Sequence, residues 1–296
     1  MPKEESDILK KIKNKQLRSR IYGEMKKQGE KEKLKLRRER KKEELEHPEL
    51  KEKRLAENVP ATIDSKRVFD ETVNAEVEGQ DDFEEYFKSP EKDPKILLTT
   101  NAHAHKQAYE FAAMLVEIIP NTTFVKRKRQ YSMKDMAKYC THREFTHLIV
   151  INEDKKEVNG MTLIHLPEGP TFYFSIDSLV KRRQITGHGS PTDHIPELIL
   201  NNFTTRLGKT VSRLFHSLFP HRPEFQGIQV ITLHNQRDYI FFRMHRYVFQ
   251  ENKRVGLQEL GPEFTLRLRR IQKGVKGEVA WEYTTAMYKD KKKFYL

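Results

Sequence analysis

The sequence lacks the features of disulfide-stabilised, secreted and membrane-spanning proteins. Its 296 residues include one tryptophan and one cysteine, Cys140. A lone cysteine cannot form an intramolecular disulfide and fits a reducing compartment, so we expect a small buried side chain on a helix. No apolar run approaches the ~18 residues of a membrane-spanning helix. The first residues also lack the apolar core of a signal peptide.

Sequence motifs for catalysis and metal binding are missing as well. There is no G-x-x-x-x-G-K-S/T phosphate loop, H-E-x-x-H, C-x-x-C or G-x-S-x-G. His103 and His105 would point about 200° apart on a regular helix, so they cannot share a metal ion there. We therefore expect no cofactor, no metal and no enzymatic activity.

Charge is unevenly distributed along the chain. Residues 1–60 hold 20 Lys/Arg and 13 Asp/Glu, residues 61–94 hold 4 and 11, and residues 95–296 hold 32 and 19. The last region alone therefore carries a net charge of +13, equal to that of the whole protein. A basic domain of this kind indicates a polyanionic partner, most commonly nucleic acid. The alternative is that the positive charge serves solubility alone.

Composition divides the chain into four regions. Residues 1–60 are a basic extension, helical in pattern, with too few apolar positions to fold alone, so we expect a solvated tail in free solution that orders when bound to RNA or to a protein groove. Residues 61–92 are an acidic linker whose aromatic residues are either anchors for a partner groove or a flap on the protein's own core. Residues 93–288 are globular, and residues 289–296 form a basic C-terminal tail.

The globular region repeats one supersecondary unit. Each copy begins with an apolar strand and a helix, continues with a second apolar strand, and closes on Gly169-Pro170 or Gly261-Pro262 followed by alternating strand. A unit of about a hundred residues is too long for a solenoid, so we expect two similar α/β halves packed as one body. The halves span residues 93–190 and 195–288. Strands alternating with helices, and later hairpin-like spacings, predict a mixed, partly antiparallel α/β (α+β) fold.

The apolar periodicity locates the individual elements. We expect helices at residues 104–119, 132–140, around 176–182 and 207–219. We expect strands or apolar strand-like segments at residues 95–100, 122–126, 146–152, 161–166, 171–175, 197–203, 228–234, 239–249, 256–260, 263–271 and 278–287. Residues 235–238 are typical of a turn.

Two clusters of cations lie in the first half. One is a run of four on a loop after a short strand. Adjacent cations repel each other and need solvent or an anion, and a phosphate backbone provides one; the run also fits a nuclear import signal. The other ends a predicted helix, where cations also complement the helix dipole. The predicted RNA contacts in this half are Lys126, Arg127, Lys128, Arg129, Lys181, Arg182 and Arg183.

Two further clusters lie in the second half. One lines a face of the strand 263–271, which is either a surface for an RNA backbone or the charged face of an edge strand. The other begins the helix 207–219. There, free backbone N–H groups and cations would hold a phosphate, whereas Thr205 by itself is explained as a helix cap. The predicted RNA contacts in this half are Arg206, Lys209, Arg213, Arg267, Arg269 and Lys273.

Three motifs together resemble the Brix domain family. They are Asn202–Gly208 (NFTTRLG) before a helix, Leu166–Thr171 (LPEGPT) and Leu260–Phe264 (LGPEF). The resemblance covers residues 92–290. It implies two α/β halves similar to the anticodon-binding domains of class II aminoacyl-tRNA synthetases, binding to rRNA, nucleolar pre-ribosomes and a dedicated protein partner. It implies neither catalysis nor a metal. The basic N-terminal region and the segment 126–131 most resemble a large-subunit member, although small-subunit members share the signatures.

These observations together predict a non-enzymatic ribosome assembly factor of the nucleus and nucleolus. It would bind pre-rRNA of the large (60S) subunit, a dedicated assembly-factor partner, other pre-60S factors and ribosomal proteins, and no membrane. One alternative is a protein-interaction hub in which RNA binding is incidental, and another is a small-subunit member of the family. A tRNA- or nucleotide-handling enzyme is disfavoured because the sequence has no nucleotide loop.

Overall fold

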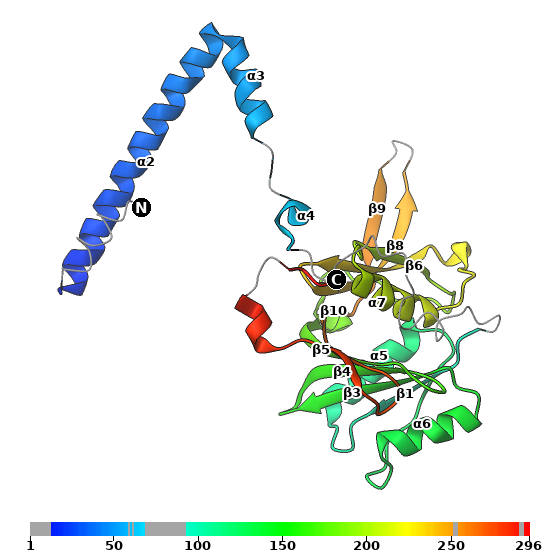
Figure 1. The fold of residues 1–296 in the computed structure, drawn as a ribbon. Helices are drawn as coiled ribbons and strands as arrows, with labels where there is room; N and C mark the ends of the chain where they lie inside the picture. The colour runs from blue at the N-terminus through cyan, green and yellow to red at the C-terminus, as the bar shows by residue number, and fades with distance from the viewer. Residues whose placement is uncertain (1–12, 59, 61, 69–92, 251–253, 290–292) are drawn as a thin grey trace. The chain divides into compact units, whose positions relative to one another are not determined.

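A computed structural model describes residues 13–296 apart from 59, 61, 69–92, 251–253 and 290–292 (Figure 1). The chain divides into two compact units, Met1–Thr62 and Ile63–Leu296.

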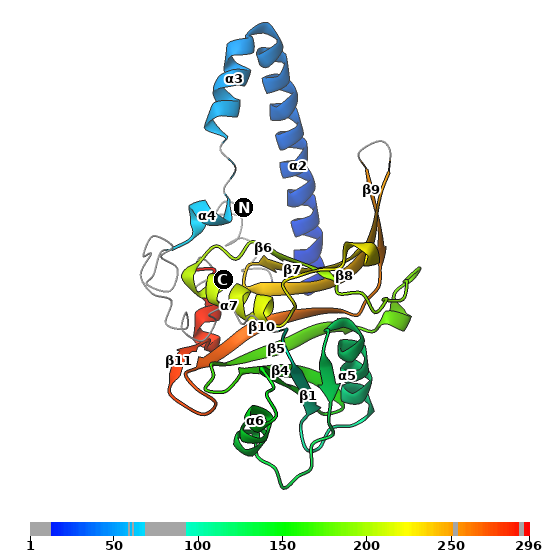
Figure 2. The ribbon, with the colours of Figure 1, turned by 90° about the vertical axis from the view of Figure 1, so that its right-hand side faces the viewer.

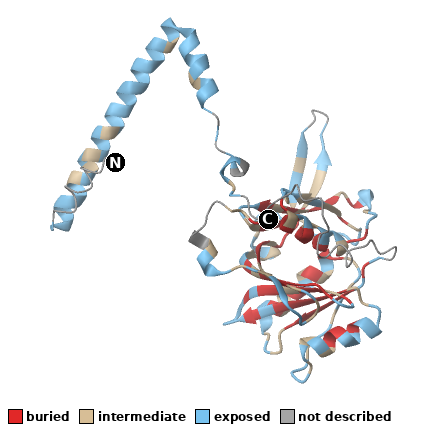
Figure 3. Cartoon of the chain, viewed as in Figure 1, coloured by how far each residue is buried: buried red, intermediate tan, exposed pale blue. Residues whose placement is uncertain are grey.

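The first unit consists of two helices, α2 (Lys15–Glu46) and α3 (Pro48–Glu57). Asn14 caps α2 because its side chain accepts from the backbone N–H groups of Gln16 and Leu17. Neither helix has a buried residue, and α2 carries 13 Lys/Arg against seven Asp/Glu (Figure 3). The guanidinium of Arg54 joins the two helices by donating to Glu44 at 2.6 and 3.1 Å. The unit therefore presents a long basic helix with no core of its own.

The second unit is built on one sheet of eleven strands with the order β2-β1-β3-β4-β5-β10-β8-β7-β6, where β9 pairs with β8 and β11 with β10. The strands are β1 (Ile96–Thr100), β2 (Thr122–Phe124), β3 (His147–Asp154), β4 (Glu157–His165), β5 (Thr171–Val180), β6 (Glu197–Asn201), β7 (Gln229–Gln236), β8 (Tyr239–Phe249), β9 (Val255–Glu259), β10 (Glu263–Gln272) and β11 (Val279–Glu282). Its helices are α4 (Ile63–Lys66), α5 (Lys106–Ile118), α6 (Met133–His142) and α7 (Arg206–Ser217).

The sheet confirms the predicted duplication. In the first half, β1 pairs in parallel with β3, and β3, β4 and β5 follow in antiparallel pairs. In the second half, β6 pairs in parallel with β7, and β7, β8 and β10 follow in antiparallel pairs. The last strands of the two halves, β5 and β10, pair with each other. The chain is therefore two similar α/β halves joined into one sheet.

One hydrophobic core serves both halves. Helices α5 and α7 pack on the same core, and each reaches a strand of the other half. Phe111 of α5 lies 5.3 Å from Phe264 of β10, and Phe215 of α7 lies 5.6 Å from Phe174 of β5, measured between ring centroids. Burial of each such side chain contributes about 1.5–3 kcal/mol. The halves therefore stabilise each other.

Helix α6 covers the opposite face of the first half only, and Figure 2 shows α5 and α6 on either side of β1. Its Cys140 is buried against this second, smaller cluster, as the sequence predicts. Burial raises the pKa of the Cys140 thiol to about 11, so the thiol stays protonated and unreactive near neutral pH.

Two predicted elements are wrong. Residues 176–182 are not a helix, because β5 continues to Val180, where it still pairs with Glu263 of β10, and only a single 3-10 turn follows at Arg182–Gln184. The last strand ends at Glu282 instead of reaching residue 287, where a 3-10 turn, Thr285–Lys289, lies instead. The predicted turn at 235–238 is confirmed, with Arg237 and Asp238 at positive φ between β7 and β8.

The end of the predicted C-terminal tail belongs to the core. Tyr295 and Leu296 are 5% and 1% exposed. Thr205 donates from its hydroxyl to the carbonyl of Tyr295 at 2.6 Å, and the N–H of Leu296 donates to Asp238 at 2.9 Å. The sequence shows a basic run here but not the apolar pair behind it, which packs beside the start of α7.

Candidate nucleic-acid interface

Helix α7 presents a basic stripe. Arg206, Lys209 and Arg213 are spaced three and four residues apart and so lie on one face of the helix. Lys209 and Arg213 are exposed and Arg206 is half-buried. The other face carries buried residues such as Val211 and Leu214, which anchor the helix in the shared core. Burial of that face fixes the direction in which the cations point.

The N-terminus of α7 is closed. Thr205 is fully buried; its hydroxyl accepts from the N–H of Gly208 at 2.8 Å and donates to Tyr295. A Cβ on Gly208 would lie 2.8 Å from the carbonyl carbon of Leu296, so the chain passes directly over this turn. The expectation that Thr205 caps the helix is confirmed. The expectation that backbone N–H groups here hold a phosphate together with Arg206 and Lys209 stays a prediction.

The loop after β2 presents three more cations. Lys126, Lys128 and Arg129 are exposed, and the ammonium of Lys126 lies 5.5 Å from the centre of the Tyr109 ring. Arg127 differs because its Nε donates to the carbonyl of Tyr131 at 3.0 Å and holds the loop in shape. Ser132 and Asp135 of the α6 capping box then fix the exit of the loop.

The cations after β5 mostly fasten the connection between the halves to α5. Lys181 forms an ion pair with Glu110, and this hydrogen bond holds the pKa of Glu110 below its usual value. Arg182 pairs with Glu117 at 2.7 Å. Arg183 is exposed. The structure thus explains Lys181 and Arg182 by contacts within the protein, which the sequence does not reveal because α5 lies about 70 residues earlier.

The prediction of a cationic solvent face on β10 is wrong. Arg267 is 5% exposed and is held between the rings of Tyr239 and Tyr283, at 4.8 and 4.2 Å from their centres. Arg269 is half-buried and donates to Ser175 at 2.9 Å. The edge-strand alternative is also wrong, because β10 lies between β5 and β8. Lys273, just beyond the strand, is exposed.

Sequence reasoning missed the pair Lys155 and Lys156. They form the two-residue turn between β3 and β4, with φ of 51° and 67°. Together with Ser178 they line a cavity of about 540 Å³. The available signal was the polar quartet 154–157 between two apolar strands, which is typical of a hairpin with its tip in solvent.

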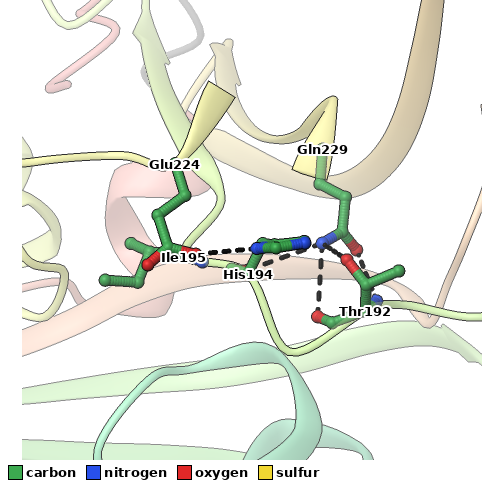
Figure 4. Close-up of polar contacts among 5 residues, drawn as sticks. All are labelled: Thr192, His194, Ile195, Glu224 and Gln229. Carbon is green, nitrogen blue, oxygen red and sulfur yellow. Dashed lines mark hydrogen bonds and ion pairs between the residues drawn. The ribbon is translucent and has the colours of Figure 1, made fainter. Parts of the chain in front are cut away.

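The connection between the halves is held by a separate polar cluster (Figure 4). His194 Nδ1 lies 2.8 Å from Glu224, and this hydrogen bond lowers the pKa of the Glu224 carboxyl. The side-chain amide of Gln229 accepts from the N–H of Thr192 at 2.9 Å and donates to its carbonyl at 3.2 Å. A Cβ on Gly227 would lie 2.5 Å from His194 Cβ, so this close approach requires glycine. These contacts fix the start of β7.

Within the described part of the chain, no group of three or more His, Cys, Asp or Glu is placed to hold a metal ion. Over the same residues, no helix is both long and apolar enough to cross a membrane.

Comparison with known proteins identifies the family of this chain. The Brix domain matches residues 101–270, from the end of β1 into β10. The chain belongs to the Brix domain family. It is 60% identical over 287 residues to Ribosome production factor 1 of Saccharomyces cerevisiae, covering 96% of this chain and 97% of that protein. It is 47% identical over 298 residues to Ribosome production factor 1 of Pongo abelii, covering 96% and 84%. The crystal structure of a probable ribosomal biogenesis protein from Aeropyrum pernix K1 is similar over 64% of this chain and 99% of that one, with 15% identity and a TM-score of 0.43.

Proposed function

We propose that this Brix-domain protein is a non-enzymatic ribosome biogenesis factor that binds pre-rRNA of the large (60S) subunit in the nucleolus. Its similarity to proteins named Ribosome production factor 1 supports a role in ribosome biogenesis. The observation that carries RNA binding is the set of exposed cations on residues 95–296, a region with a net charge of +13. These are Lys126, Lys128, Arg129, Arg183, Lys209, Arg213 and Lys273, with Arg206 at the start of the α7 stripe.

The arrangement favours recognition of the RNA backbone. Lysine and arginine side chains on a loop and on a helix face contact phosphates, which position a protein without reading bases. Arg206 to Arg213 spans about 10 Å along the axis of α7, at 1.5 Å per residue. Rigid cations on a fixed scaffold select an RNA by its shape. The protein would then hold a folding intermediate of pre-rRNA.

The first unit adds a second contact. Its basic helix α2 buries nothing of its own, so it gains stability by lying along RNA or a neighbouring factor. We propose that the protein binds a dedicated assembly-factor partner and contacts other pre-60S factors and ribosomal proteins. Such contacts would explain why α2 is a long basic helix with no buried residue.

Salt-dependent binding tests the RNA surface. We expect Lys126→Ala, Lys128→Ala and Arg129→Ala together to reduce the salt slope for a large-subunit pre-rRNA fragment by about 2–3 units, roughly one per lost phosphate contact. The matched control replaces Lys134 and Lys138 of α6 and Arg143 at its C-terminal cap, which removes the same charge from exposed positions outside the proposed RNA contacts. An unchanged slope in the loop variant would exclude this loop, and equal losses in both variants would indicate binding by net charge alone.

Crosslinking of the protein to RNA in cells tests the choice of subunit. We expect crosslinks within one region of large-subunit precursor. Crosslinks in small-subunit precursor would retain the family and overturn the subunit. If crosslinks are absent and protein partners still co-purify, the protein is an interaction hub instead.

A further inference from the structure

A polar cavity of about 540 Å³ lies beside the β3–β4 turn. Its walls are that turn, the end of β5, the connection that follows β5, and Gln107 near the start of α5. The volume is within the range of small-ligand sites. Of the predicted RNA contacts, only Lys181 lines the cavity, and its ammonium already forms an ion pair with Glu110. The cavity is therefore separate from the exposed cations proposed above.

Three residues that line the cavity have a left-handed backbone. Lys155 and Lys156 have φ of 51° and 67°, and Ser178 has φ of 53°. A two-residue hairpin turn with positive φ at both positions favours asparagine and glycine, and lysine seldom adopts this conformation. Unfavourable backbone conformations of this kind gather at binding sites. A binding role would explain why lysines occupy this turn.

The two lysine side chains are available to a ligand. Both are exposed, and neither has an ion-pair or hydrogen-bond partner among the described residues. In particular, no ion pair joins them to the acids on either side of the turn, Asp154 and Glu157. Two adjacent ammonium groups repel each other, and an anion between them relieves that repulsion. The turn therefore favours an anionic group.

Two side-chain amides add donors to the cavity. Gln107 Oε1 accepts from the ammonium of Lys181, and Gln184 Oε1 accepts from the backbone N–H of Lys181 at 2.8 Å. These bonds commit both amide oxygens. The NH2 group of each amide, which only donates, is left for a ligand, since neither donates to a described residue. Lys181 thus orients both amides toward an acceptor.

The cavity also has two carboxylates, from Glu157 and Asp177. Both are exposed, and neither is in an ion pair among the described residues. A bare phosphate would leave them facing an anion, and a metal ion would face the two lysines. A ribonucleotide satisfies both kinds of group, because its phosphate accepts from lysine and its ribose hydroxyls donate to a carboxylate.

The equivalent turn of the second half shows the opposite chemistry. Arg237 and Asp238 form the turn between β7 and β8, with φ of 53° and 67°. Asp238 accepts there from the N–H of Leu296 at 2.9 Å. The residue equivalent to Asp238 in the first half is Lys156, which donates instead. The two turns share one geometry, but the second half binds a donor of its own chain, whereas the first half has an open donor.

We propose that this cavity binds one ribonucleotide unit by its phosphate and its ribose. Lys155 and Lys156 hold the phosphate together with the two amides, and Asp177 and Glu157 accept from the ribose hydroxyls. None of the described residues that line the cavity is aromatic, so the base is neither stacked nor read there. The inference rests on the proposed function, because an RNA chain supplies the unit. It adds that the protein distinguishes RNA from DNA at this cavity.

Binding of one labelled single-stranded sequence, as RNA and as DNA, tests the carboxylates in the full chain. We expect the unaltered protein to prefer RNA by about 10-fold, and Glu157→Ala with Asp177→Ala to reduce that ratio about 5-fold or more. Affinity for DNA should hold or rise, because two negative charges are removed. The control Asp193→Ala with Glu282→Ala removes two exposed acids outside the cavity and should keep the ratio within about 2-fold. An unchanged ratio in the cavity variant would overturn the proposal.

A change of the turn tests the phosphate contact without risk to the fold. Lys155→Asn with Lys156→Gly installs the favoured turn residues, so the unfolding midpoint should hold or rise. RNA affinity should nevertheless fall about 10-fold, and the salt slope should fall by about 0.7–1.4, the loss of one or two contacts to single-stranded phosphates. Lys134→Ala with Lys138→Ala removes the same charge from α6. Equal losses in the two variants would refute a specific site at the turn.

Competition by free nucleotides identifies the source of the unit. Adenosine and uridine 5′-monophosphate, and their 2′-deoxy counterparts, are titrated against the labelled RNA. Equal competition by the two ribonucleotides, lost in the Glu157→Ala/Asp177→Ala variant, would support the site with a free nucleotide as occupant. If only the oligonucleotide shows the ribose preference, the unit belongs to an RNA chain. If the unaltered protein binds no RNA, the proposed function fails, and the cavity fails with it only if the free ribonucleotides also do not bind.

Discussion

The two halves cover the faces of their parts of the sheet differently. In the first half, α5 and α6 bury both faces of the sheet. In the second half, α7 buries one face, and the other carries charged residues: Arg243 pairs with Glu263 at 3.2 Å and with Glu259 at 3.6 Å. A sheet face can be left open when its side chains are polar and paired with each other. The first half thus covers both faces of its sheet with helices, whereas the described residues of the second half cover one.

The helix starts differ in the same way. The carboxylate of Glu153 on β3 closes the start of α5 by accepting from the N–H groups of His105 and Ala108 at 2.6 and 3.3 Å. Thr205 and the carbonyl of Tyr295 close the start of α7. The first half uses a neighbouring strand, whereas the second half uses a segment from the far end of the chain.

The largest expected effect breaks the contact between the halves. Phe264 is 2% exposed and packs on Phe111 of α5 and on Phe242 of β8, whose ring centroid lies 4.3 Å away. Phe264→Ala should lower the free energy of unfolding by about 3–5 kcal/mol, because it leaves a cavity in the shared core. Urea unfolding followed by probes in each half should show both transitions shifting together. The exposed Phe225→Ala serves as control, and separate transitions would mean that the halves fold independently.

The sequence predicts this framework because its signals are local. The apolar runs of β1, β3 and β7, and the two Gly-Pro landmarks, mark the repeat without knowledge of the partner strands. The errors come from contacts distant in sequence. Arg267 is buried because it packs against Tyr239 and Tyr283, which are 28 and 16 residues away in the sequence. Thr205, at the start of α7, donates to Tyr295, which is 90 residues later. Local charge patterns cannot show which cations such contacts remove from the surface.

The second prediction concerns the contacts of Thr205 at the start of α7. Thr205→Val keeps the shape of the side chain but removes the acceptor for Gly208 and the donor to Tyr295. Because Thr205 is fully buried, unfolding free energy should fall by about 1–3 kcal/mol. Ser132→Ala, at the exposed cap of α6 in the first half, should cost about 0.5–1 kcal/mol. Equal losses measured by chemical denaturation would show that the closing contact with Tyr295 adds nothing.

The third prediction asks whether the α7 stripe of the second half contributes specifically to RNA binding. Lys209→Ala with Arg213→Ala should weaken binding of a large-subunit pre-rRNA fragment about 10-fold and reduce its salt slope by about 1.5–2 units, the loss of two phosphate contacts. The matched pair Lys134→Ala and Lys138→Ala removes two exposed cations from α6 of the first half. Titrations at several salt concentrations that give equal losses for both pairs would rule out a specific role for the α7 stripe.

The smallest expected effect concerns a buried residue that differs between equivalent strands. β3 begins with His147 and β7 with Gln229, and both side chains are buried. Burial, together with the nearby His165, holds the pKa of His147 well below its usual value of 6.5. The folded protein therefore keeps this ring neutral while the unfolded chain takes up a proton below about pH 6.5, so its contribution is full above that pH and is lost as pH falls.

Between pH 7.5 and 6.0, this loss amounts to about 0.8 kcal/mol of unfolding free energy. His147→Gln installs the side chain that the second half uses. It retains a group able to hydrogen-bond Ser217, which lies 3.0 Å from His147 Nε2. The difference in stability between the variant and the unaltered protein should therefore change by that amount across the two pH values. Parallel pH profiles for His147→Gln and the unaltered protein would mean that His147 accepts a proton in the folded state.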